Sequence, residues 1–162
     1  MPSKQQSIIL GGLVAGLLST SYLGLINMLL CAGVIIGALV SVWHYTDTNE
    51  LTIKAGQGAV IGLLAALVGW AVSLVLNYIL IKAGVRSDLV FSQFILDRFG
   101  DSLPEESVDQ ILEQMKAEVT LAKYLTSALW GVFFSVVFGA IGGSIGAVLF
   151  KKGGDEPTEF AD

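Results

Sequence analysis

The chain has 162 residues, of which 54% are hydrophobic and only 14% are charged, and its mean hydropathy is +0.73. Soluble domains usually carry about 25% charged residues, so this composition indicates an integral membrane protein. The net charge of −5 disfavours binding to nucleic acid, because phosphate contacts require clustered lysine and arginine. Cys31 is the single cysteine, which excludes an internal disulfide and leaves the redox compartment open.

Charged residues are absent from three long intervals, which predict four membrane-spanning helices. The interval between Lys4 and His44 is about twice as long as the roughly 20 residues that one helix needs to cross a bilayer, so it should fold back as two spans. Each of the other two intervals holds one span. We therefore predict a single all-α membrane domain over residues 1–162, with both termini on the same side of the membrane. The predicted spans cover residues 8–23, 25–45, 55–82 and 121–150.

Polar and aromatic residues mark where the first three spans should begin and end. The polar stretch 19–24 predicts the turn in the first interval. Residues 43–45 (Trp-His-Tyr) are typical of a membrane–water interface, and residues 46–50 then form a polar loop. Trp70 falls near the middle of the third span, so its indole N–H needs an acceptor on a neighbouring helix.

Residues 84–120 predict an amphipathic, acidic helical insertion outside the membrane. A first helix should cover residues 87–99, and a second should begin at a capping box of Ser102 and Glu105, with Pro104 in its first turn. Apolar side chains recur at helical spacing in both helices and predict a partner-binding face. The residues of this face are Phe91, Phe94, Ile95, Phe99, Ile111 and Met115.

The second helix of the insertion should continue without a break into the fourth span, because neither glycine nor proline occurs between residues 105 and 130. Its acidic residues lack the alternating oxygen ligands and the glycine of a calcium loop, so they predict a solvated face. Residues 153–162 should form a flexible tail.

Short sequence similarities indicate an internal repeat of two helical hairpins. Residues 12–18 of the first span resemble residues 58–64 of the third. Residues 33–39 of the second span resemble residues 142–148 of the fourth, so the order is the same in both halves. This order predicts a parallel repeat about an axis along the membrane normal. Chance recurrence of small and aliphatic residues is the alternative, and the sequence leaves both open.

Every predicted span contains a Gly-x-x-x-Gly motif, whose small residues let two helix backbones approach closely. Helices in lipid gain little from hydrophobic exclusion, so they associate through such close contacts. The motifs predict packing within the chain, a homo-oligomer, or docking against other membrane subunits, and packing within the chain is the simplest of these. The predicted packing glycines are Gly12, Gly16, Gly33, Gly37, Gly58, Gly62, Gly69, Gly139, Gly142, Gly143 and Gly146.

His44, the only histidine, is the one candidate cofactor-binding residue, as a ligand for the metal of a chlorophyll or haem. No second histidine, cysteine or carboxylate lies at ligand spacing from it, so a hydrogen bond at the interface is the simpler interpretation. We predict no cofactor and no metal. Cys31 is interpreted as a small core residue, and Asn27 and Asn77 as sources of turn or interhelical hydrogen bonds.

No charged residue lies in the interior of a predicted span, because Lys82 and Lys123 fall at the ends of the third and fourth spans. Proton relays, voltage sensors and ion-coupled transporters normally place ionisable groups there. A membrane enzyme would need a base or a nucleophile with an orienting partner, and neither that pattern nor a phosphate-binding loop is present. We therefore predict a protein that is not an enzyme and has no catalytic residue.

The stretch 11–19, a short turn, a glycine-rich second span and the stretch 58–62 resemble small, glycine-rich, four-span bacterial membrane proteins of uncharacterised families. The resemblance covers about residues 8–81 and does not include the insertion. It implies a bacterial inner membrane and no defined activity. Lysines on the side of the termini weakly favour a cytoplasmic location for both ends.

Three functional hypotheses follow. The first is a non-catalytic structural or accessory membrane protein, packed through its glycine faces in a homo-oligomer or against other subunits, with the insertion as a platform for a partner. The second is a small pore or carrier for a neutral or apolar solute. The third is a pigment- or lipid-binding subunit of an energy-converting complex, with His44 as the ligand.

Overall fold

A computed structural model describes residues 4–20, 31–85, 87–117 and 120–153 of the chain. All regular structure in these residues is helical, which confirms the predicted all-α class. The helices are α1 (Lys4–Leu18), α3 (Ala32–Asn49), α4 (Ala55–Lys82), α5 (Ser87–Phe99), the 3-10 helix η2 (Gly100–Ser102), α6 (Glu105–Lys116) and α7 (Leu121–Leu149). Asn27, most of the predicted turn 19–24 and most of the predicted tail lie outside the described residues.

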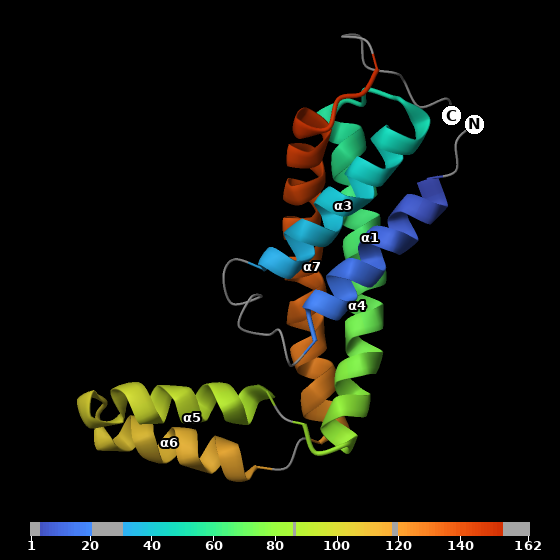
Figure 1. Ribbon diagram of the computed structural model, residues 1–162. Helices are drawn as coiled ribbons and strands as arrows, with labels where there is room; N and C mark the ends of the chain where they lie inside the picture. Colours follow the sequence, from blue (N-terminus) through green and yellow to red (C-terminus); the bar gives the residue numbers. More distant parts are fainter. Residues whose placement is uncertain (1–3, 21–30, 86, 118–119, 154–162) are drawn as a thin grey trace.

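Four helices, α1, α3, α4 and α7, pack against one another and form what we call the helical body (Figure 1). α4 and α7 are the longest, with 28 and 29 residues, and they run antiparallel along the whole body. α1 and α3 cover this pair near the end where α3 connects to α4, which we call the α3–α4 end. At the opposite end, α5 and α6 form a separate helical hairpin (Figure 1).

Two helices are long and apolar enough to cross a membrane: α4, over Ala55–Lys82, and α7, over Tyr124–Leu149. Only 28% of the most apolar stretch of α4 is buried, and 33% of that of α7, so the protein does not enclose either helix. α1 has 15 residues and α3 has 18, several of them polar, and the described part of neither helix meets the same criterion. Length and composition therefore support two of the four predicted spans.

The predicted polar loop 46–50 is wrong for its first four residues, which form the last turn of α3. Side chains satisfy carbonyl groups in this turn. Thr46 Oγ1 donates to Val42 O at 3.0 Å, and Asn49 Nδ2 donates to Tyr45 O at 2.7 Å. Glu50 ends the helix with a φ of 51°, the left-handed conformation that is common just after a helix.

The predicted continuous helix from the insertion into the fourth span is also wrong. α6 ends at Lys116, and Ala117 has an extended backbone (φ −66°, ψ 133°) before α7 begins at Leu121. This break allows α6 to lie beside α5 instead of extending the axis of α7 (Figure 1). The predicted capping box is absent, because Ser102 belongs to η2 and Pro104 is the N-cap of α6 without a side-chain cap bond.

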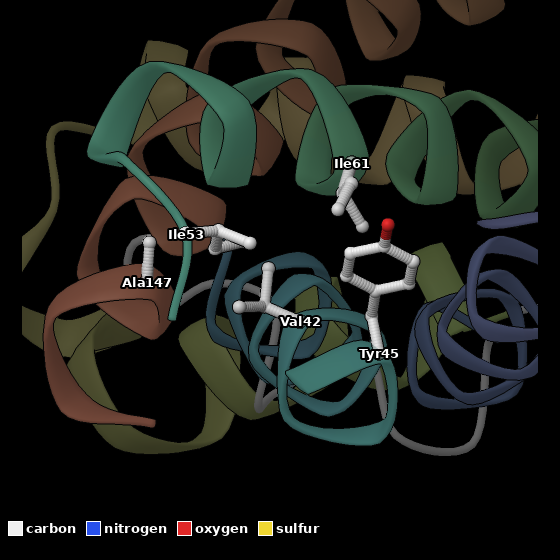
Figure 2. Packing of buried hydrophobic residues seen from close by; sticks show 5 residues of the cluster. All are labelled: Val42, Tyr45, Ile53, Ile61 and Ala147. Carbon is white, nitrogen blue, oxygen red and sulfur yellow. The ribbon is translucent and has the colours of Figure 1, made fainter. Parts of the chain in front are cut away.

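A small core of buried side chains lies at the α3–α4 end (Figure 2). In Figure 2 the ring of Tyr45 from α3 points toward Ile61 of α4, and Val42 lies between Tyr45 and Ile53 of the α3–α4 connection. Ala147 completes the cluster from α7. This core joins α3, α4 and α7 at one end of the body.

Candidate functional site

The contact between α4 and α7 is built from four of the predicted packing glycines. A Cβ atom added to Gly62 would lie 2.7 Å from the Cα of Gly143, and one added to Gly143 would lie 2.9 Å from the carbonyl carbon of Gly58. Real Cβ atoms do not approach so closely, and the atoms they would meet belong to the backbone. Gly139 faces Gly62 in the same way, at 2.9 Å from its carbonyl oxygen. The two helices therefore meet backbone to backbone at these positions.

A second glycine contact joins α1 to α4. Gly12 faces Val68 and Ala65, and Gly16 faces Val72 and the carbonyl oxygen of Gly69, with added Cβ atoms 2.6 to 3.0 Å from these groups. The approach allows α1 to pack tightly against the same helix that contacts α7 on another side. Both glycines of the Gly-x-x-x-Gly motif in the first predicted span thus contact another helix of the same chain.

α3 is held by glycines of its neighbours and by one of its own. Gly142 and Gly146 of α7 face Ile35 and Val42, where added Cβ atoms would lie 3.0 Å away. Gly37 of α3 faces Ala15 of α1. Gly33, the other predicted packing glycine of α3, is also buried and has an interaction partner.

Sequence reasoning missed one packing glycine, Gly11, which faces Gly37 and Ser41 on α3. The signal was present, because Gly11 and Ala15 form a small-x-x-x-small pair on one side of α1, and Gly37 and Ser41 form another on α3. A search restricted to two glycines therefore overlooks the contact between the first two helices.

Polar side chains bridge the helices farther from the core. The indole Nε1 of Trp70 donates to Ala128 O on α7 at 3.1 Å, which confirms the predicted acceptor on a neighbouring helix. Asn77 Nδ2 donates to Ser19 O at 3.3 Å, which confirms the predicted interhelical bond. The hydroxyl of Tyr124 donates to Leu74 O at 2.6 Å. Each of these donors is therefore satisfied by a backbone carbonyl.

His44 lies at the α3–α4 end, where its Nδ1 is 2.8 Å from the hydroxyl of Ser7 on α1. Ser7 is buried, and sequence analysis had not selected it. The pair ties α1 to α3, and a second polar link, between Lys152 Nζ and Asp47 at 2.9 Å, ties the end of α7 to α3. Within the described residues, no group of three His, Cys, Asp or Glu side chains is placed to hold a metal ion.

Two buried hydroxyls at the same end have no hydrogen-bond partner. They belong to Ser41 on α3 and Thr52 in the α3–α4 connection. Ser41 lies against Gly11, and the closeness of the two backbones leaves no space for a bound molecule between them. These hydroxyls therefore belong to the packing of the body.

The structure divides the predicted partner-binding face of the insertion into two groups. Phe94 and Phe99 of α5 are 53% and 52% exposed. The other four predicted residues are only partly exposed: Phe91, Ile95, Ile111 and Met115. The acidic residues Glu105, Glu106, Asp109 and Glu113 of α6 are exposed, so the hairpin combines an apolar helix with an acidic one.

These features define a class of protein: an all-helical chain with two candidate membrane-spanning helices that meet along glycines. The chain belongs to DUF4199, a family described as a protein of unknown function, whose model matches residues 7–152. The predicted membership of a family of unknown function is thereby confirmed. The match includes the α5–α6 hairpin, which the resemblance seen in the sequence did not. No curated protein and no solved structure matches the chain.

Proposed function

We propose that this chain is a non-catalytic structural or accessory protein of a membrane, with four spans and an extramembrane hairpin that contacts a partner. The observation that carries the proposal is the apolar outer surface of the helical body. Large hydrophobic side chains are exposed along all four of its helices, including Leu13, Ile36, Val75 and Leu129. Such a surface is unfavourable in water and matches the hydrocarbon core of a bilayer.

The contacts of α1 support a first span that crosses most of the bilayer. Ser19 lies beside Asn77, which is 22 residues after the first residue of α4. At 1.5 Å per residue, the part of α4 from Ala55 to Asn77 is about 33 Å long, which is similar to the roughly 30 Å hydrocarbon core. The carbonyl of Leu17 accepts a bond from the hydroxyl of Thr20 at 2.6 Å, so a side chain satisfies one of the free carbonyls at the end of α1.

The position of α3 supports the second span. Ile35 lies against Gly142, and the next residue, Gly143, contacts Gly58 in the first turn of α4. α3 begins near the middle of the body and ends at the α3–α4 end (Figure 1), whereas Ser19 lies beside Asn77, farther toward the other end. With 18 residues, α3 would supply the part of the proposed second span that lies at the α3–α4 end.

A cysteine at position 20 tests the four-span arrangement. In single-cysteine proteins with Cys31→Ser, we expect Thr20→Cys to react with an impermeant maleimide from the same side of the membrane as Gln110→Cys in α6. Lys152→Cys is the matched control for the opposite side, where we place both termini. Labelling of positions 20 and 152 from one side would contradict the proposal and leave two spans.

The glycine faces are assigned to packing within the chain rather than to a homo-oligomer. The motifs of α1, α4 and α7 all face other helices of the same chain at backbone distance. The same closeness argues against a pore between α4 and α7, because Gly58 and Gly143 leave no opening there. Contact with other subunits then depends on exposed residues, such as those of the α5–α6 hairpin.

Native mass spectrometry of the protein extracted in a mild detergent tests the accessory role. We expect stoichiometric companion subunits, because the hairpin presents exposed apolar and acidic residues together. Deletion of residues 87–117 is the matched variant and should remove the companions while the body remains in the membrane. A chain that is recovered alone or only with copies of itself would contradict the accessory role. We place the protein in a bacterial inner membrane, as the sequence resemblance implies.

A further inference from the structure

The α5–α6 hairpin lies across the direction of α4 and α7 (Figure 1). It extends sideways from the end of the body where α4 ends and α7 begins. This inference rests on the proposed function: if α4 and α7 cross a membrane, a hairpin in this direction runs along the membrane surface.

The two helices of the hairpin differ in charge, and their order relative to the body is the order that a bilayer favours. α5 lies on the side toward the middle of the body, and α6 lies on the far side (Figure 1). Between Ser87 and Phe99, α5 carries two acidic residues and one basic residue among many apolar ones. α6 carries four acidic residues and one lysine in 12 residues. The apolar helix is therefore next to the proposed membrane, and the acidic helix is next to water.

One exposed side of α5 carries Phe94 and Arg98, which are one helical turn apart. Ser92, Ile95 and Leu96, which are partly buried, occupy other positions of the helix. An exposed phenylalanine is unfavourable in water but favourable at the boundary of the acyl chains, and a neighbouring guanidinium can bind lipid phosphate. The pair has the chemistry of a helix that lies in a membrane surface, and Gln93 and Asp97 are exposed beside it.

The end of α4 from which the hairpin extends has features of a membrane–water interface. The rings of Tyr78 and Tyr124 are 6.1 Å apart, and the ammonium group of Lys82 is 5.8 Å from the Tyr78 ring. Only residues 83–86 separate Lys82 from the start of α5 at Ser87. Five residue steps from Lys82 to Ser87 can span at most about 18 Å, so α5 begins within this distance of the end of α4.

We infer that α5 lies in the headgroup region of the phospholipid bilayer that α4 and α7 cross. Phe94 points toward the acyl chains, Arg98 contacts lipid phosphate, and α6 covers the side of α5 that faces water. The exposed acidic face of α6 is then the surface that remains for a protein partner.

Fluorescent labels at single cysteines in the full chain test this inference. The background is Cys31→Ser, and the protein is reconstituted in vesicles of phosphatidylcholine and phosphatidylglycerol. An environment-sensitive label at Phe94→Cys or at Arg98→Cys should be quenched by a nitroxide-labelled lipid. Its quenching by aqueous iodide should be about threefold weaker than for Gln110→Cys in α6, because headgroups shield it. The label at position 98 retains Phe94, so the two positions control for each other.

Leu129→Cys, on the exposed side of α7, separates failure of this inference from failure of the proposed function. If position 129 is shielded from iodide but positions 94 and 98 are quenched as strongly as position 110, the hairpin stands in water and the inference is overturned. If iodide also quenches position 129, α7 does not cross the bilayer, and the proposed function fails together with the inference. The added substitution Phe94→Asp in the protein labelled at position 98 should restore quenching by iodide.

Discussion

Gly143→Ala should lower the free energy of unfolding by about 3 kcal/mol, at the upper end of the range for overpacking a protein interior. The added methyl group would meet the backbone of Gly58 and Gly62, at 2.9 Å from the carbonyl carbon and from the Cα atom. Backbone atoms cannot rotate away as a flexible side chain can, so α4 and α7 would have to separate. The measurement is an SDS titration of the purified protein in detergent, followed by circular dichroism.

Gly131→Ala is the matched control, because it adds the same methyl group to the same helix. The nearest atom to this methyl group would be Nε1 of Trp70 at 3.5 Å, an ordinary van der Waals distance. We expect a change within about 0.5 kcal/mol, since surface substitutions away from tight contacts usually stay within that limit. Equal effects of the two substitutions would show that α4 and α7 do not meet at their glycines.

Ile61→Ala should lower the free energy of unfolding by about 3 kcal/mol, within the range observed for truncation of a buried isoleucine. Ile61 is 0% exposed and belongs to the core at the α3–α4 end, where Figure 2 shows it beside Tyr45. Removal of its side chain leaves a cavity that the closely packed glycine contacts prevent from collapsing. The same SDS titration reports the change.

Val60→Ala tests which side of α4 faces the core, because Val60 is adjacent to Ile61 in the sequence and is 52% exposed. It should change the free energy of unfolding by less than about 1 kcal/mol, since its side chain loses few protein contacts. A larger loss for Val60→Ala than for Ile61→Ala would mean that α4 is rotated relative to its neighbours. It would also remove the argument that the exposed apolar side of α4 faces lipid.

The sequence by itself determined the features that depend on local composition and on the length of apolar stretches. The charge-free stretch between Lys54 and Lys82 corresponds to α4, because a helix in an apolar layer continues until charged residues can reach water. The need of Trp70 for an acceptor was also evident from the sequence, since a buried N–H group must be satisfied wherever it lies. Membership of a family of unknown function agrees with what the residues resembled.

Only the tertiary structure decided which residues meet. The break at Ala117 has no local signal, because it arises where α6 folds back on α5 rather than from a glycine or proline. Gly11 gains its role only from Gly37 on another helix, and the exposure of Phe94 depends on the side from which α6 contacts α5. Local sequence sets the length and the faces of a helix, whereas the partner of each face is a contact between distant segments. Such a contact becomes visible only when the helices are placed together.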